Sequence, residues 1–253
     1  MSFNPQLKKS NAMTNLPVEY LNWDSEFFNR RIARVTSGWV STDEIERILS
    51  WAVEERIDCL YFLADGQQTS ATGLAEEKGF HFVDLRVTFI KDLTKPERTF
   101  IPTWHIRRAA EKDLGTLKEM ARNAFQLSRF HVDDHFDQAK ADLMYEVWVE
   151  NDLRTTGHDI WVIDAEGQLA AYTSVSVKKD GKAQIGLVGT QAAWRGKGLA
   201  LELQRFLSEE LQNEGIEEVE VVTQGRNIPA QNLYQRAGYF ISSIDLWYHK
   251  WFD

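Results

Sequence analysis

The stretch from Arg195 to Ala200, with the sequence Arg-Gly-Lys-Gly-Leu-Ala, constrains the fold of this chain most strongly. It lies between an apolar, strand-like run at residues 183–190 and an amphipathic, helix-like run at residues 199–212. Gly196 and Gly198 allow a tight turn, and they let a ligand approach the backbone because neither carries a Cβ. The helix that follows begins with unpaired amide groups and the positive end of its dipole. The sequence therefore predicts a strand, a glycine turn and a helix that together bind phosphate.

Two common phosphate loops do not fit this stretch. A Walker A loop needs Ser or Thr after Gly-Lys, but Gly198 follows Lys197, and Gln191 stands where its first glycine belongs. A dinucleotide-binding loop needs a third glycine at the position that Leu201 occupies. What remains is the pattern Arg/Gln-x-x-Gly-x-Gly/Ala after a strand. The alternative is an ordinary helix start with a surface arginine.

A second pattern follows at residues 227–239, Asn-x-x-Ala-x-x-Leu-Tyr-x-x-x-Gly-Tyr. It predicts a short helix, because Asn227 suits the N-cap, Pro229 the first turn, and Gly238 the left-handed residue that ends a helix. Together the two patterns resemble the GNAT superfamily of N-acetyltransferases, whose glycine loop holds the diphosphate of acetyl-CoA. A strand-like run at residues 217–223 separates them, and the order of the three segments strengthens the resemblance.

The resemblance implies where acetyl-CoA binds. The backbone edge of the strand that ends at Thr190 would hydrogen-bond the pantetheine arm like an added strand. The acetyl-CoA contacts expected on this basis are Val188, Thr190, Arg195, Gly196, Lys197, Gly198, Leu199, Ala200 and Asn227. Tyr234 matches the general acid of the family, because a phenol of pKa ~10 can donate to the leaving thiolate, whose thiol has a pKa of ~8.5. The alternative for Tyr234 is a tyrosine that only packs on its helix.

The composition agrees with a cytoplasmic enzyme. At 253 residues with 43% hydrophobic residues, the chain can bury the core of one large or two small domains. Cys59 is the single cysteine, which excludes a disulfide within the chain and a cysteine metal site, and its apolar surroundings predict a buried side chain. The net charge of −9 argues against general binding of nucleic acid or acidic membranes. We see no membrane-length apolar run and no leader-like opening.

The periodicity divides the chain into four parts. We expect a disordered tail at residues 1–16, an N-terminal α/β region at 17–93, a linker at 94–103 and an acetyltransferase domain at 104–253. In the first region we expect strands at 19–23, 32–35, 59–64 and 81–90, and helices at 42–55 and 70–78. Lys91 to Pro102, with its prolines and charges, is typical of a linker.

The second region has the order of elements that the GNAT fold implies: strand, two helices, three strands, helix, strand, helix, strand. We therefore expect an α/β protein with a mixed, mostly antiparallel sheet flanked by helices. The smaller N-terminal α/β region would resemble a partial GNAT half.

A narrower resemblance covers most of the chain. Residues 21–28, Leu-Asn-Trp-Asp-Ser-Glu-Phe-Phe, are similar to the N-terminal signature of the TDP-fucosamine acetyltransferases, and residues 124–130, 185–187 and 223–227 match further segments of these enzymes. They N-acetylate TDP-4-amino-4,6-dideoxygalactose. One difference is the loop at residues 191–196, which keeps the full superfamily form where the sugar enzymes are shorter. The full loop supports the prediction that the chain binds acetyl-CoA. The difference from the sugar enzymes weakens the prediction that the acceptor is a sugar.

Direct attack needs a neutral amine, so a base must remove a proton from the acceptor. Asp84 aligns with an acidic position that the resemblance implies, and it would act through water. A carboxylate suits this role best when partial burial raises its pKa. The alternatives are a solvated strand carboxylate at this position, a water chain, or Glu146 as the base.

Arg129 and His131 are the candidates for binding the acceptor. The Arg129 guanidinium could grip a nucleotide diphosphate, or it could pair on the surface with a neighbouring aspartate at position 133 or 134. His131 and His135 flank these aspartates, a pattern that suggests a metal. Since the superfamily uses no metal, we predict none here.

The sequence thus predicts an acyl-CoA-dependent N-acetyltransferase that moves acetyl from acetyl-CoA to a primary amine by direct attack. The favoured acceptor is a nucleotide-linked aminodeoxysugar, with TDP as the nucleotide. Another amine (a protein N-terminus, a polyamine or an antibiotic) stays open as the acceptor. A non-catalytic module that senses coenzyme A stays open as a different class. We expect no nucleic-acid or membrane partner, and the aromatic strand at residues 241–252 could form the edge of a homodimer.

Overall fold

The computed structural model describes residues 15–95 and 100–252. Most of the predicted tail and residues 96–99 of the predicted linker lie outside the described residues. Leu16, near the start of the described part, packs against a hydrophobic core. In the part of the chain that is described, no helix combines the length and the apolar character needed to cross a membrane.

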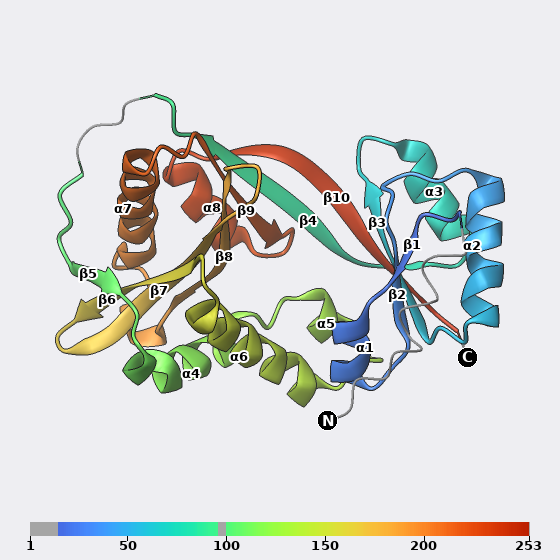
Figure 1. Cartoon of the computed structure of the whole chain (residues 1–253), viewed down its shortest axis with the longest axis horizontal. Helices are drawn as coiled ribbons and strands as arrows, with labels where there is room; N and C mark the ends of the chain where they lie inside the picture. The colour runs from blue at the N-terminus through green and yellow to red at the C-terminus, as the bar shows by residue number, and fades with distance from the viewer. Residues whose placement is uncertain (1–14, 96–99, 253) are drawn as a thin grey trace. The chain divides into compact units, whose positions relative to one another are not determined.

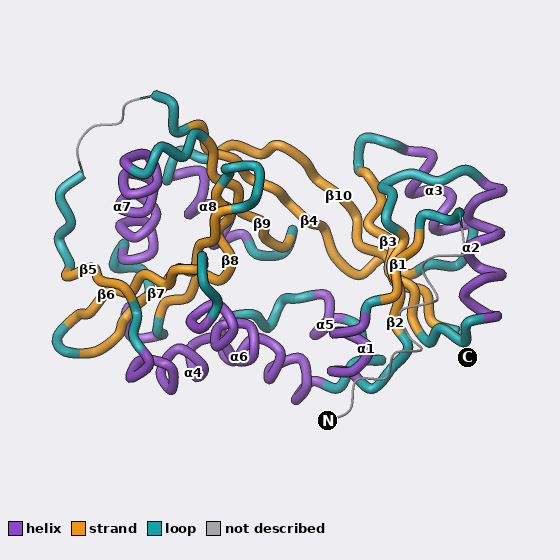
Figure 2. Tube along the Cα trace, viewed as in Figure 1, coloured by secondary structure: helices purple, strands orange, loops and turns teal. Residues whose placement is uncertain are grey.

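The chain forms two compact units, drawn in Figures 1 and 2. Unit 1 holds the chain up to Arg86 and again from Ile244 onward, and unit 2 holds Val87–Ser243. Two long strands, β4 (His81–Asp92) and β10 (Phe240–Trp251), contribute residues to both units. The unit boundaries thus fall within β4 and β10, and β10 returns the end of the chain to unit 1. The domain limits drawn from the sequence stay a prediction.

Unit 1 is built on a short mixed sheet. The strands are β1 (Val18–Tyr20), β2 (Ile32–Val35), β3 (Cys59–Asp65) and the end of β10, in that order. β2 and β3 run parallel and pair along the whole of β2, whereas the β1–β2 and β3–β10 pairs are antiparallel. β3 is buried along most of its length, as expected for a parallel strand covered on both faces.

Three helices complete unit 1: α1 (Asn22–Phe28), α2 (Thr42–Glu54) and α3 (Thr69–Glu77). The predictions of α2 and α3 are confirmed to within one residue at either end. The predicted strand at residues 19–23 is wrong beyond Tyr20, because helix α1 begins at Asn22. Within α1, the Trp23 and Phe27 rings stack with centroids 4.9 Å apart, which is the contact that an i,i+4 spacing allows on a helix.

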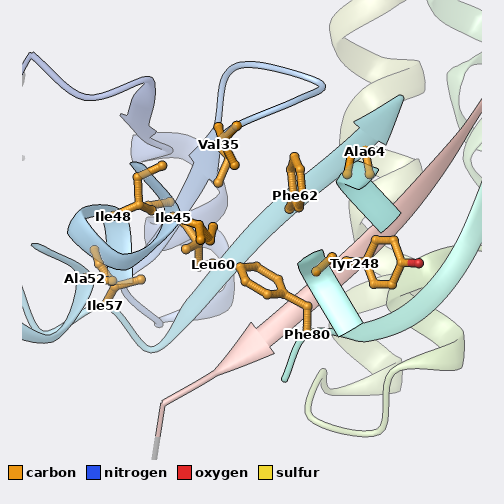
Figure 3. Packing of buried hydrophobic residues seen from close by; sticks show 14 of the residues in the cluster. Val35, Ile45, Ile48, Ala52, Ile57, Leu60, Phe62, Ala64, Phe80 and Tyr248 are labelled. Carbon is orange, nitrogen blue, oxygen red and sulfur yellow. The ribbon is translucent and has the colours of Figure 1, made fainter. Parts of the chain in front are cut away.

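The core of unit 1 lies between its helices and its strands. Figure 3 shows side chains of α2 directed at those of β2 and β3, with Phe80 and Tyr248 beside them. The residues labelled there are Val35, Ile45, Ile48, Ala52, Ile57, Leu60, Phe62, Ala64, Phe80 and Tyr248. Cys59, on the opposite side of β3 from Leu60, has no exposed surface, so the prediction of a buried thiol is confirmed.

Unit 2 carries a larger, mostly antiparallel sheet. Its strands run in the order β10, β4, β9 (Glu218–Gln224), β8 (Ala183–Thr190), β7 (Gln168–Val177), β6 (His158–Ala165) and β5 (His105–Arg108). The β8–β9 pair is parallel, and the β5–β6, β6–β7 and β7–β8 pairs are antiparallel. Glu166 and Gly167 join β6 to β7 as a hairpin, with φ of 51° and 78° as a tight two-residue turn requires.

The helices of unit 2 flank this sheet. α4 (Leu114–Ala124) and α6 (Gln138–Arg154) lie on one side of the strands, and α7 (Leu199–Asn213) and α8 (Ile228–Arg236) lie on the other (Figure 1). The predicted fold class, a mixed sheet flanked by helices, is confirmed. Sequence periodicity missed the one-turn helix α5 (Arg129–Val132), which is too short to show a period. It also assigned Lys91 to a linker, whereas Lys91 lies in β4 and is 2% exposed.

Candidate active site

The two parallel strands of unit 2 separate along their length. β8 pairs with β9 only at Ala183, Gln184 and Ile185, although both strands continue for several residues beyond these pairs. From Gly186 to Thr190, β8 therefore has no β9 partner, and its backbone groups on that edge are open to an added strand. This is the segment that the sequence predicted for the pantetheine arm.

A β-bulge explains why the strands separate there. The β7–β8 register shifts between Thr173 and Val175, opposite Gly186 and Leu187 and directly after the last β8–β9 pair. The Leu187 amide donates to Ser174 Oγ at 2.8 Å, in place of a backbone partner. Since a bulge bends its strand and increases the local twist, it turns the end of β8 away from β9. Gly186 fits this kink because a Cβ would lie 2.7 Å from Ser174 Oγ.

The glycine loop follows β8 and is open to solvent. Arg195, Gly196, Lys197 and Gly198 are all exposed, and the two glycines have φ of 78° and 84°. The left-handed backbone conformation, and not crowding, explains the need for glycine. A Cβ built at either position meets nothing within 4 Å. The open space lies where a ligand would approach the backbone.

Two side chains fix the shape of this loop. Arg195 Nε donates to the carbonyl oxygen of Thr190 at 3.3 Å, which ties the loop to the end of β8. Lys197 Nζ lies 4.1 Å from the centre of the buried Trp194 ring. Both cations therefore stay beside the loop, and they add positive charge to it.

Helix α7 begins directly after the loop without a side-chain cap. Its N-cap residue is Gly198, and no side chain there accepts from the first-turn amides. The acidic residue of the first turn, Glu202, accepts instead from the Thr103 and Trp104 amides at 2.6 and 2.7 Å. The first amides of α7 and its dipole are thus available to an anion. Leu199, 1% exposed, anchors the helix start in the core.

Helix α8 has the local structure that its sequence predicts. Asn227 is the N-cap, and its Oδ1 accepts from the Ala230 amide at 3.2 Å. Gly238, with φ of 90°, ends the helix. The Asn227 side chain is therefore engaged within its own helix.

Tyr234 lies on the buried face of α8 and is 4% exposed. Its ring contacts Phe89 of β4 and Tyr239, with centroids 5.6 and 5.8 Å apart. Burial raises the pKa of the Tyr234 phenol above its ordinary value, so the hydroxyl keeps its proton throughout the neutral range. The structure thus places Tyr234 as a buried, protonated phenol on α8.

The two candidate bases differ in their surroundings. Asp84 belongs to unit 1, where it is 3% exposed and accepts from the Leu85 amide at 2.8 Å. Glu146, on α6 of unit 2, forms an ion pair with Arg122 on the neighbouring helix. Such a pair is typical of a structural contact between helices.

The predicted acceptor residues occupy helix α5. The Arg129 guanidinium lies over the Phe130 ring at 4.1 Å, and the side chain is half-buried. His131 is 4% exposed in its side chain, with Nδ1 2.8 Å from Ser128 Oγ and Nε2 2.9 Å from Asp142 Oδ1. Both ring nitrogens are thus engaged, which makes His131 a residue that orders this segment.

Asp142 holds His131 from the next helix, α6. Burial raises the pKa of Asp142, but the hydrogen bonds from His131 and Gln126 lower it more, and the net shift is downward. Asp142 therefore stays ionised beside the imidazole. Sequence reasoning missed Ser128 and Asp142, and the only available signal was the i,i+3 spacing of Ser128 and His131.

A neighbouring aspartate engages the His135 side chain. His135 Nδ1 lies 2.8 Å from Asp133 Oδ1 within one turn. Among the described residues, no group of three or more His, Cys, Asp and Glu side chains could hold a metal ion.

Comparison with known proteins adds a family and a fold. Residues 120–239 match the family model described as "Acetyltransferase (GNAT) family", a stretch that contains both the glycine loop and Tyr234. The chain is 26% identical to the spore coat polysaccharide biosynthesis protein SpsD of Bacillus subtilis (strain 168) over 139 residues. That alignment covers 55% of this chain and 48% of SpsD, so the chain spans about half the length of this curated relative.

The solved structures show the same fold at low identity. A GCN5-related N-acetyltransferase from Sphaerobacter thermophilus has a TM-score of 0.66 and 20% identity, covering 92% of this chain and 76% of that one. A GCN5-related N-acetyltransferase from Kribbella flavida has a TM-score of 0.65 and 14% identity, covering 94% and 88%. These matches extend over both units of the chain.

Proposed function

We propose that this chain, whose residues 120–239 match the acetyltransferase (GNAT) family model, transfers acetyl from acetyl-CoA to a primary amine. The observation that carries the proposal is the opened β8–β9 pair beside the uncapped start of α7. The free β8 edge would take the pantetheine amides, and the α7 amides with the loop would take the diphosphate. The two sites are consecutive in the chain, as a single extended ligand requires.

Tyr234 is the proposed proton donor. When the amine attacks the thioester carbonyl, a C–N bond forms and the C–S bond breaks, leaving a thiolate that needs a proton. The Tyr234 phenol is buried and protonated, so it can donate as the negative charge develops on sulfur. Because its pKa lies above that of a free thiol, the phenolate regains its proton once the product leaves.

Asp84 is the proposed base for the amine, and Glu146 is the rival. Replacing each by its amide tests them together: Asp84→Asn should remove the acidic limb of the pH dependence of kcat, and Glu146→Gln should leave it in place. The reverse result would assign the base to Glu146. An unchanged profile in both variants would leave the proton to a water chain.

An amino group on a nucleotide-linked deoxysugar is the proposed acceptor. Two observations support it: the N-terminal signature at residues 21–28, and the similarity to a protein of spore coat polysaccharide biosynthesis. Arg129 and His131 are the residues proposed to serve acceptor binding. His131 would act by holding α5, with Arg129 beside it, since its own nitrogens are engaged.

Thiol release from acetyl-CoA with a panel of amines tests the function. We expect release above background with a TDP-linked 4-amino-4,6-dideoxysugar. Little release is expected with spermidine, an aminoglycoside or a peptide with a free N-terminus. Calorimetry with acetyl-CoA alone is the control. Binding without release for any amine would favour a coenzyme A sensor, and absence of binding by folded protein would overturn the proposal.

A further inference from the structure

Lys91 is a charged residue in the interior of unit 2. It lies near the end of β4 and is 2% exposed. Taking an ammonium group out of water is costly unless hydrogen bonds replace its hydration. The hydrogen-bond partners of Lys91 therefore indicate its role in the structure.

The ammonium group bonds to two helices at once. Lys91 Nζ donates to Ser208 Oγ of α7 at 2.9 Å and to the carbonyl oxygen of Ala237 at 2.8 Å. Ala237 is the C-cap residue of α8, so Lys91 neutralises the negative end of that helix dipole. Lys91 Nζ also lies 5.6 Å from the centre of the Tyr239 ring.

These bonds lead directly to the backbone of Tyr234. The Ala237 amide donates to the Tyr234 carbonyl oxygen at 3.1 Å, and the Tyr239 amide donates to the same oxygen at 3.0 Å. Lys91 thus binds the carbonyl oxygen of Ala237, and the amide of the same residue binds the carbonyl oxygen of Tyr234. The Tyr239 hydroxyl extends the network by donating to Gln204 Oε1 of α7 at 3.3 Å.

The same network reaches the sheet. Gln204, fully buried, donates from Nε2 to Thr173 Oγ1 of β7 at 3.3 Å. Ser208 Oγ donates to the Gln204 carbonyl oxygen at 2.8 Å. Helix α7 carries the glycine loop at its start, and α8 carries Tyr234. The network therefore fixes the donor helix against the helix proposed to bind diphosphate.

We propose that Lys91 is a positioning residue for the acetyl transfer, which sets the Tyr234 hydroxyl relative to the sulfur of acetyl-CoA by tying the C-terminus of α8 to α7. The inference rests on the proposed function, since it assigns to Lys91 an effect exerted through Tyr234. A small displacement of a donor group is enough to slow a proton transfer, even where binding is intact.

A double-mutant cycle between Lys91→Met and Tyr234→Phe tests this inference, with kcat and the KM for acetyl-CoA as readouts. We expect Lys91→Met to lower kcat about tenfold with KM little changed, and to cause no further fall in the Tyr234→Phe background. Lys95→Met is the matched control, because Lys95 is 84% exposed and should leave both constants unchanged.

The outcomes separate the two claims. An equal fall in kcat with and without the Tyr234 hydroxyl would show that Lys91 is merely structural and would overturn the inference. An unchanged kcat in Lys91→Met would overturn it as well. A Tyr234→Phe variant with the parental kcat would instead remove the proton donor from the proposed function. If Lys91→Met does not fold, Ser208→Ala removes one partner of Lys91 and serves in the same cycle.

Discussion

Helices α2 and α7 both follow a strand and a turn, yet their N-termini are built for opposite purposes. At the start of α2, Ser41 Oγ accepts from the Glu44 amide at 3.3 Å, and Glu44 Oε2 accepts from the Ser41 amide at 2.9 Å. This capping box uses the protein's own side chains to satisfy the helix amides. At the start of α7, Gly198 offers no side chain, and the amides are left for a ligand.

The difference shows that the amides of a helix start are available to a ligand only where no side chain of the protein caps them. Both units contain a parallel strand pair, but β2 and β3 stay paired along the whole of β2, whereas β8 and β9 separate after Ile185. In unit 1 the start of α2 is capped and β2 is fully paired with β3. In unit 2 the start of α7 has no side-chain cap, and the end of β8 is not paired with β9. The two units thus differ in the features that the proposed function requires.

The largest expected effect comes from closing the α7 start. Gly198→Val places a β-branched residue at φ of 84° and should strain the loop proposed to hold the diphosphate. We expect acetyl-CoA affinity to fall roughly 100-fold, about 2.7 kcal/mol, by calorimetry.

Gly215 provides the matched control for this change. It follows the other end of α7 with φ of 80°, and a Cβ there also meets nothing within 4 Å. Gly215→Val should cost similar stability but leave acetyl-CoA affinity unchanged. Equal losses of affinity in both variants would mean that general destabilisation, not the open helix start, explains the result.

The next effect compares a tyrosine of each unit. Tyr234→Phe should lower kcat about 100-fold, the usual scale for losing a general acid, with little change in the KM for acetyl-CoA. Tyr248 of unit 1 donates to Glu76 Oε1 at 3.2 Å, so Tyr248→Phe should cost about 1 kcal/mol of stability and no activity. Steady-state kinetics and thermal unfolding of both variants check the pair. Parental turnover in Tyr234→Phe would contradict its proposed role.

A smaller effect, on stability alone, is expected from removing the N-terminal cap of α2. Ser41→Ala removes the capping box and should lower the free energy of unfolding by about 1 kcal/mol. Because Ser41 belongs to neither the glycine loop nor α7, acetyl-CoA affinity should stay the same. A change in affinity, measured under conditions where the variant is fully folded, would break the comparison between the two helix starts.

The smallest effect is the part of the pH dependence of stability that Glu44 of unit 1 contributes. The backbone hydrogen bond from Ser41, followed by that from its side chain, lowers the pKa of Glu44 below its ordinary value of 4.5. The stabilisation is therefore present above pH 4.5 and is lost as the pH falls through the lower folded-state pKa. Thermal unfolding between pH 6 and pH 3 should show this loss in the parent and not in Glu44→Gln. An identical slope in the variant would exclude Glu44 as its source.

The elements with local signals could be predicted from the sequence. Three features depend on residues within a few positions of one another: the glycine turn, the amphipathic run of α7, and the two ends of α8 at Asn227 and Gly238. Each lies where its pattern predicts. Helix α1 was missed because its aromatic residues fit a strand as well as one face of a helix. Periodicity cannot separate the two in so short a segment.

The features that required the structure depend on distant residues. The β8–β9 separation follows from a bulge opposite Ser174, which no local pattern announces. The charged, proline-containing run predicts a linker at Lys91, yet Lys91 is buried and donates to Ser208 and Ala237, far along the chain. Likewise, the partner that engages His131 lies on the following helix, at Asp142.

The burial of Cys59 has a practical consequence for measurement. It is the only thiol of the 253-residue chain, and the native fold gives it no exposed surface. A colourimetric disulfide reagent that detects coenzyme A release should therefore read turnover with almost no signal from the folded protein. The same reagent, without substrate, becomes a reporter of the opening of unit 1, because Cys59 reacts only when β3 leaves its neighbours.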